Sequence, residues 1–153
     1  MSFALHTKAF AEGGEIPAQF TCSGADVSPA LTWDGTPQNT QAFVLIVHDP
    51  DAPSGDFTHW IIYDIPAKTT SLSEGVAKTA ELPDGARHGR NGFGRVGYGG
   101  PCPPPGKPHR YFFKMYALDA KLGLDAGASR GQVEQAMKGH VLAEAEVMGT
   151  YRR

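Results

Sequence analysis

This sequence of 153 residues lacks an excess of charge of one sign, a long apolar run and the pattern of a secretory signal. Charge of one sign is not in excess, since 14 Lys and Arg stand against 16 Asp and Glu, so we expect no nucleic-acid partner. An apolar run of 18 residues is also absent, so no membrane span or stable membrane insertion is expected. The first residues (MSFALH) lack the basic and apolar regions of a secretory signal, which predicts a cytoplasmic location.

Cysteine is scarce, and the two cysteines, Cys22 and Cys102, are far apart in the sequence. Their spacing matches no short metal-binding or redox motif. In a reducing cytoplasm we expect two separate buried thiols. The alternative is that the two residues meet in space, as a disulfide or as thiols in contact, because both lie in turn-rich loops.

Glycine (19) and proline (12) are abundant, which predicts many turns and few long helices. Apolar residues make up 41% and charged residues 20%, as in an ordinary globular protein. We therefore expect residues 1–153 to form a single domain with a substantial core. The Gly- and Pro-rich stretch at residues 97–106 is too short for a linker and is interpreted as a rigid, ordered loop.

The strand signals predict a mainly β fold. A continuous apolar run, residues 42–47, is typical of a strand buried on both faces. Further strands are expected at residues 57–65, ended by Pro66, and at 110–118, with weaker ones at 3–9 and 30–33. The tail, residues 142–150, has a pattern compatible with either helix or strand.

Two short helices are expected. The first begins at Ser129, which forms a capping box with Gln132, and ends near Gly139. Its apolar spacing includes Val133, Ala136, Met137 and His140. The second is expected at residues 70–77, although Gly75 weakens it.

A stiff turn at residues 49–53 (DPDAP) directly follows the buried run. Two prolines restrict its backbone. We consider a cis peptide bond before Pro50 or Pro53 an expectation for this turn, because X-Pro is the common site of cis bonds. The turn can present Asp49 and Asp51 at the end of a strand. A hairpin return would then bring His59 back toward Asp49.

The Gly- and Pro-rich loop leads into a second group of polar residues. Alternate residues of a strand face the same side, so His109 and Tyr111 should project together while Arg110 points away. Backbone N–H groups of Gly99 and Gly100 could approach ligand oxygens closely.

Together these residues suit an anion. Histidines and a tyrosine can donate hydrogen bonds to phosphate or carboxylate oxygens. Asp49 can either hold an imidazole tautomer or bind a ligand ammonium. Each signal also has an ordinary structural interpretation: a core histidine beside Trp60, a simple Asp-Pro turn, and an exposed polyproline segment.

Residues 87–95 form a further feature, with three arginines and one histidine. They could steer anions toward the mouth of the site. The alternative is a solvated, flexible loop.

Four ordered motifs carry a family resemblance: DPDAP at residues 49–53, THW at 58–60, GPCPP at 100–104 and HRY at 109–111. With residues 20–29 and 139–143, the sequence resembles the phosphatidylethanolamine-binding protein family over nearly its whole length. It is most similar to the bacterial Raf kinase inhibitor-like branch.

The resemblance implies an antiparallel β-sandwich with a ligand pocket at one end and no metal or redox cofactor. It implies these ligand-binding residues: Asp49, Asp51, His59, Gly99, Gly100, Pro101, His109 and Tyr111. The family binds phosphate-bearing head groups, nucleotides and small anions. The sequence ends at Arg153 without the longer C-terminal helix of animal members, which weakens the expectation of lipid binding and of Raf-type inhibition.

The leading hypothesis is a binding protein for a small anionic or phosphorylated ligand, with a role in regulating kinase signalling. One alternative is a kinase or serine protease inhibitor that acts by protein contact, and a homodimer is a further expectation. A hydrolase using Asp and His is the other alternative. No Gly-x-Ser-x-Gly nucleophile motif is present, so we expect no enzyme and assign no catalytic residue.

Overall fold

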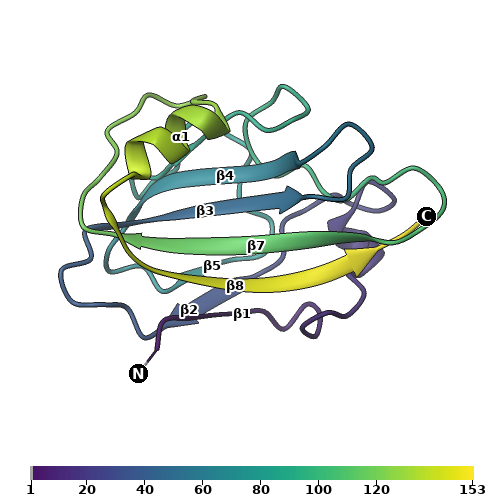
Figure 1. The fold of residues 1–153 in the computed structure, drawn as a ribbon, viewed down its shortest axis with the longest axis horizontal. Coiled ribbons are helices and arrows are strands. Elements are labelled where there is room, and N and C mark those ends of the chain that lie inside the picture. Colours follow the sequence, from purple (N-terminus) through teal and green to yellow (C-terminus); the bar gives the residue numbers. More distant parts are fainter. Residues whose placement is uncertain (1) are drawn as a thin grey trace.

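Two antiparallel sheets face each other in the computed structural model, which describes residues 2–153 (Figure 1). The smaller sheet has the order β1-β2-β5 and the larger β6-β4-β3-β7-β8. The strands are β1 (Ala4–His6), β2 (Leu31–Asp34), β3 (Ala42–Asp49), β4 (Phe57–Pro66), β5 (Ser71–Leu72), β6 (Arg87–His88), β7 (His109–Leu118) and β8 (Val141–Tyr151). The predicted mainly β sandwich is confirmed, as are the strands expected from residues 42–47, 57–65 and 110–118.

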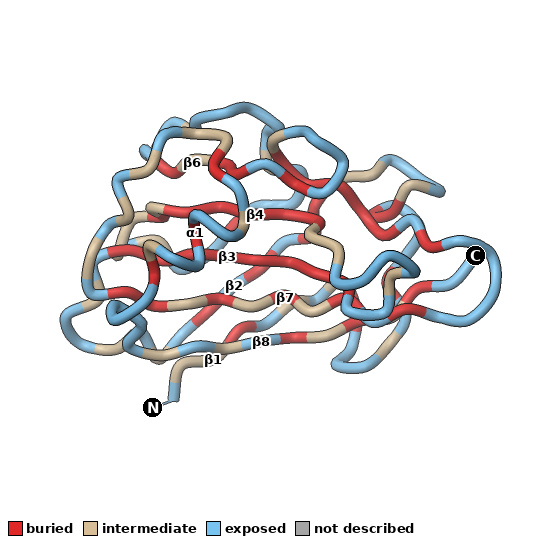
Figure 2. The backbone as a smooth tube through the Cα atoms, turned by 45° about the horizontal axis from the view of Figure 1, so that its top comes forward, coloured by how far each residue is buried: buried red, intermediate tan, exposed pale blue. Residues whose placement is uncertain are grey.

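Strand β3 is buried along its whole length because both of its faces are covered (Figure 2). Phe43, Leu45 and Val47 lie in the core shared with the smaller sheet. Val44 and Ile46 belong to a second cluster, which includes Val133 and Met137 from the helix. The continuous apolar run thus reflects two cores on opposite sides of one strand.

The α-helix, α1 (Arg130–Met137), begins as the sequence predicts. The Ser129 hydroxyl accepts a hydrogen bond from the Gln132 backbone, and the Gln132 side chain accepts one from the Ser129 backbone. The predicted end near Gly139 is confirmed, because the helix stops at Met137, is capped by Lys138 and is followed by Gly139 at a φ of 81°; His140, which fits the apolar spacing, lies beyond the helix. The His140 ring instead bonds to Asp119 on the surface.

The second predicted helix, at residues 70–77, is wrong. That segment forms β5, which pairs with β2. The other short helix is a 3-10 turn, η1 (Ala18–Phe20). The ambiguous tail is strand β8, because β7 offers it a pairing partner over its full length.

The long loops are ordered by specific contacts. All described peptide bonds are trans, so the expected cis bond before Pro50 or Pro53 is wrong. The cysteines are not separate thiols: Cys22 and Cys102 form a disulfide that joins the loop after η1 to the Pro-rich loop. The Cys22 N–H also donates to the carbonyl of Pro101 at 3.1 Å. The expectation of separate thiols was based only on the reducing state of the cytoplasm, which does not indicate whether two cysteines lie close together in the fold.

Within residues 2–153, no helix has the length and apolar character needed to cross a membrane.

A buried histidine also ties the core together. His88 donates from Nδ1 to the Thr79 carbonyl at 2.6 Å, and its Nε2 accepts from the Trp60 indole at 3.0 Å. These bonds require a neutral ring, and burial lowers the pKa of His88 below its ordinary 6.5.

Removal of the disulfide should destabilise the fold. The bond closes a loop between residues 80 apart, so replacing Cys22 and Cys102 by alanine should lower the free energy of unfolding by about 2–5 kcal/mol. Urea denaturation measures this loss. Wild type unfolded in reducing agent is the matched control and should behave like the double variant; a loss below about 0.5 kcal/mol would contradict the prediction.

The fold should also lose stability in mild acid. Below about pH 6.5 the unfolded chain binds a proton at His88, whereas the folded protein keeps the ring neutral. The free energy of unfolding should therefore decrease as the pH is lowered, by at most about 1.4 kcal/mol per pH unit for this ring. Urea denaturation at pH 7.5, 6.5 and 5.5 tests this. His88→Gln, which cannot titrate, should show a shallower slope, whereas equal slopes would exclude His88 as the cause.

Candidate functional site

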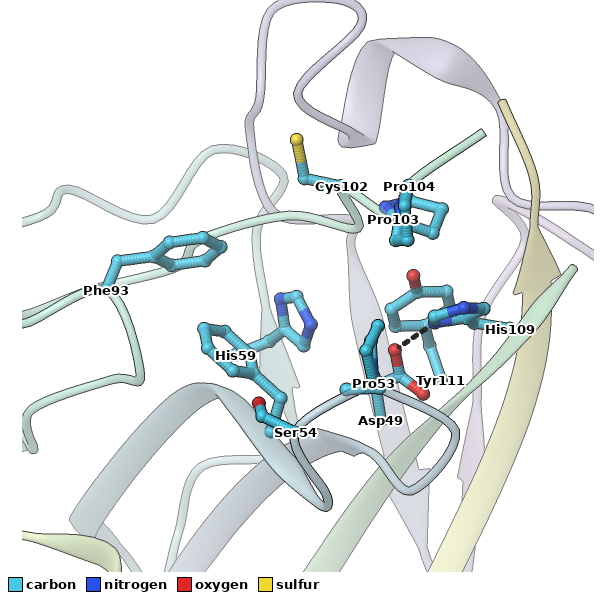
Figure 3. A pocket seen from close by; sticks show the side chains of 12 residues that line it. Asp49, Pro53, Ser54, His59, Phe93, Cys102, Pro103, Pro104, His109 and Tyr111 are labelled. Atoms are coloured by element: carbon cyan, nitrogen blue, oxygen red, sulfur yellow. Dashed lines mark hydrogen bonds and ion pairs between the residues drawn. The ribbon is translucent and has the colours of Figure 1, made fainter. Parts of the chain in front are cut away.

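A cavity of about 260 Å³ opens at the end of the larger sheet where β3 ends and β7 begins (Figure 3). Its polar side comes from the end of β3 and from the first residues of the two strands beside it, β4 and β7. Asp49 ends β3, His59 lies near the start of β4, and His109 and Tyr111 lie at the start of β7. All four side chains are buried, so the site is walled by protein rather than formed on an open surface.

The β3–β4 hairpin brings His59 beside Asp49 as predicted. Asp49 pairs in register with Phe57, and His59 follows two residues later on the same side of β4. The His59 Nδ1 donates to the Gly99 carbonyl at 2.6 Å, while Nε2 has no hydrogen-bond partner among residues 2–153. Burial lowers the pKa of His59, although the Gly99 bond and the charge of Asp49 oppose this. The free protein therefore presents a neutral imidazole to the cavity.

Asp49 orients the second imidazole. One carboxylate oxygen accepts from His109 Nδ1 at 2.7 Å, and the other accepts from the Asp51 backbone N–H at 2.7 Å. Of the two predicted roles for Asp49, the structure shows the tautomer-holding one, because both oxygens are already engaged. The remaining His109 nitrogen, Nε2, is left on a ring that lines the cavity.

Tyr111 supplies a hydroxyl without a partner. Its oxygen is buried and makes no hydrogen bond with any described residue. The ring lies between the two imidazoles, with centroids 5.2 Å from His59 and 6.5 Å from His109. Burial raises the pKa of Tyr111, and the charge and proximity of the Asp49 carboxylate act in the same direction, although its oxygens are not placed for a hydrogen bond of normal geometry. The phenol therefore keeps its proton and can donate it in a hydrogen bond. A buried donor of this kind is costly unless something in the cavity accepts from it.

The four central residues, Asp49, His59, His109 and Tyr111, are thus brought together as the sequence predicts. Asp51 is placed differently. Its carboxylate forms a two-pronged ion pair with Arg110, which lowers the pKa of Asp51 to about 2. Arg110 points away from the cavity as expected, and Asp51, which is paired with it, does not line the cavity either.

The glycine backbone does not contribute donors to this cavity. The Gly99 N–H donates to the His59 carbonyl and the Gly100 N–H to the Asp26 carboxylate, at 2.9 and 2.7 Å. The expectation that these N–H groups meet a ligand is therefore wrong, because the fold already uses both. Pro101 lies outside the cavity lining, and its carbonyl holds Cys22.

The sequence reasoning missed the apolar wall of the cavity. This wall is formed by Ala52, Pro53, Phe57, Phe93, Pro103 and Pro104. The rings of Phe57 and Phe93 meet edge to face at 4.9 Å. A side chain at Gly92 would collide with the Phe57 ring, so the glycine is needed for this contact. The available signal was a phenylalanine between two glycines in a polar stretch.

The described residues contain no cluster of three or more His, Cys, Asp or Glu side chains placed to hold a metal ion. Ser54, also in the lining, makes no hydrogen bond with either imidazole. The arrangement provides one strong neutral donor, two imidazoles of controlled tautomer and an apolar wall.

Comparison with known proteins agrees with this architecture. The family model described as Phosphatidylethanolamine-binding protein matches residues 6–152. A UPF0098 protein of Methanothermobacter thermautotrophicus is 52% identical over 149 residues, covering 97% of this chain and 98% of the relative. A UPF0098 protein of Aquifex aeolicus is 52% identical over 151 residues, covering 97% and 88%.

Two solved structures share the fold over the whole chain. The Chlamydia trachomatis protein described as a putative phosphatidylethanolamine-binding protein homolog has a TM-score of 0.90 at 38% identity, covering 99% of this chain and 98% of its own. Escherichia coli YbcL, described as a member of the mammalian family, has a TM-score of 0.93 at 36% identity, covering 100% and 99%. With this fold and these matches, the chain belongs to the phosphatidylethanolamine-binding protein family.

Proposed function

We propose that this protein binds a small anionic ligand, a carboxylate or a phosphoryl group, in the cavity between His59 and His109. The observation that carries the proposal is the Tyr111 hydroxyl, which is buried, protonated and without a protein partner. A ligand oxygen that accepts from this hydroxyl would satisfy it. Because the two imidazoles flank the same ring, the accepted oxygen would lie beside both of them.

Proton uptake is part of this proposal. Each imidazole uses its Nδ1 proton inside the protein, so its Nε2 is an acceptor while the ring is neutral. An anion binds well only when Nε2 becomes a donor, through protonation of the ring. Ligand binding should therefore take up a proton from solution.

The apolar wall bounds the ligand's size. A volume of about 260 Å³ lies just below the usual range of small-molecule pockets, about 300–1,000 Å³. It suits an acidic group with a short apolar or aromatic substituent against Phe57 and Phe93. A phosphorylated head group is compatible with this size, whereas two acyl chains exceed it.

The proposal is a binding protein, without catalytic turnover. Ser54 has no imidazole to activate it, and the Tyr111 hydroxyl is held in its protonated form, so neither hydroxyl is prepared as a nucleophile. Regulation of a kinase, inhibition of a protease and homodimerisation stay predictions from the sequence. The cytoplasmic location also stays a prediction, and the Cys22–Cys102 disulfide favours a less reducing compartment.

Tyr111→Phe separates binding from folding. Since the hydroxyl has no partner in the protein, its removal should leave the free energy of unfolding unchanged within about 0.5 kcal/mol or raise it slightly. The same change should weaken acetate or phosphate binding by about tenfold or more, because a hydrogen bond to a charged group is lost. Titration calorimetry measures the affinity and urea denaturation the stability; unchanged affinity would refute the role of Tyr111 in ligand binding.

Affinity should rise as pH falls from about 8 to 6. Acetate and sulfate keep their charge in this range, so any change comes from the protein. For each proton taken up, the dissociation constant should fall by up to about tenfold per pH unit. His59→Gln should flatten the profile. A flat profile in wild type would show that the imidazoles act as neutral groups and would contradict proton-coupled binding.

A further inference from the structure

A second cavity lies next to the first and shares two lining side chains with it, Phe93 and Cys102. It has a volume of about 220 Å³, and Asp26, Lys78 and Arg95 also line it. The first cavity contains the imidazoles, whereas the second contains the cations. The aromatic ring and the disulfide therefore form a partition between two chemically different spaces.

One tight loop places residues in both cavities. Asn91, which is buried, accepts through its side-chain oxygen from the backbone N–H groups of Phe93 and Arg95, at 2.9 and 3.2 Å. Its side-chain nitrogen donates to the Gly97 carbonyl at 2.9 Å. This residue thus fixes the loop backbone that carries both the ring and the cation. The flexible-loop interpretation of residues 87–95 is wrong for this part of the stretch.

The Phe93 side chain separates the two cavities only in part. A Cβ atom at Gly99 would lie 2.6 Å from the Phe93 ring, so the ring packs directly against the glycine backbone. Its other contacts are Phe57 at 4.9 Å and His59 at 5.7 Å between ring centroids. The residue is nevertheless 43% exposed. The exposed part of the side chain offers an apolar path from one cavity to the other.

The charges of the second cavity favour a negative group. Two cations, Lys78 and Arg95, stand against one carboxylate, Asp26. The Asp26 carboxylate already accepts from the Gly100 N–H at 2.7 Å, and Lys78 donates to the Asp26 backbone carbonyl at 2.8 Å. The guanidinium of Arg95, an exposed residue, makes no hydrogen bond or ion pair with the described residues. Arg95 is thus the cation left available for a ligand.

We propose that the two cavities form one bipartite site for small molecules with two acidic groups joined by an apolar spacer. This proposal rests on the anion-binding function proposed above. One acidic group binds at Tyr111 and the imidazoles, the spacer crosses the Phe93 ring, and the second acidic group binds at Arg95 with support from Lys78.

Straight-chain acids test this arrangement, with each dicarboxylate compared with the monocarboxylate of equal length. Titration calorimetry of wild type at low salt, over chains of five to ten carbons, should show one length at which the dicarboxylate binds about three- to five-fold more tightly, as a partly exposed ion pair provides. Arg95→Gln should abolish this advantage and leave the monocarboxylate affinity unchanged. Arg90→Gln is the matched control, because Arg90 is exposed on the same loop and lines neither cavity.

The outcomes separate the two proposals. If monocarboxylates bind but no dicarboxylate has an advantage at any length, the bipartite site is overturned and the anion site stands. The same conclusion follows if Arg95→Gln weakens both acids equally or if Arg90→Gln removes the advantage. If neither class of acid binds, the anion-binding function itself fails.

Discussion

The carboxylate of Asp49 is the contact on which the site depends. One oxygen holds the His109 ring and the other holds the backbone of Asp51, so a single buried group joins the end of β3, the turn after it and the start of β7. Without it, the imidazole would lose both its tautomer and its orientation. Because β3 is covered on both faces, the carboxylate is carried by the most buried strand of the sandwich. The position of the cavity-facing groups is therefore set by the core.

Burial and the proposed anion binding make opposite demands on His59. An enclosed pocket disfavours a charged imidazole, and the pKa of His59 is lowered for that reason. Anion binding favours the charged ring. A bound anion would ease the conflict, since it would add negative charge beside the imidazole to that of Asp49. The neutral hydroxyl of Tyr111 has no such conflict, because its raised pKa keeps the donor in place at every relevant pH.

Close backbone contact explains how two aromatic rings come to line the cavity. Phe57 packs where Gly92 has no side chain, and Phe93 packs where Gly99 has none. Of the two glycines predicted to approach ligand oxygens, Gly99 packs against the Phe93 ring and Gly100 against the backbone of Phe20 and Thr21, and the fold uses the N–H groups of both. The same loop directs Arg95 toward a neighbouring cavity. One ordered segment thus carries both the Phe93 ring and Arg95.

The sequence by itself determined the features that depend on local pattern. The uninterrupted apolar run predicted β3, the capping box predicted the start of α1, and strand alternation placed His109 and Tyr111 on one side with Arg110 opposite. Only the tertiary structure decided which polar groups are free, which cysteines meet and that Phe93 forms the partition. The physical reason is that Asp51, Gly99, Gly100 and Cys22 find partners 40 to 80 residues away. Such pairings follow from how the sheets and loops pack, and no local periodicity encodes them.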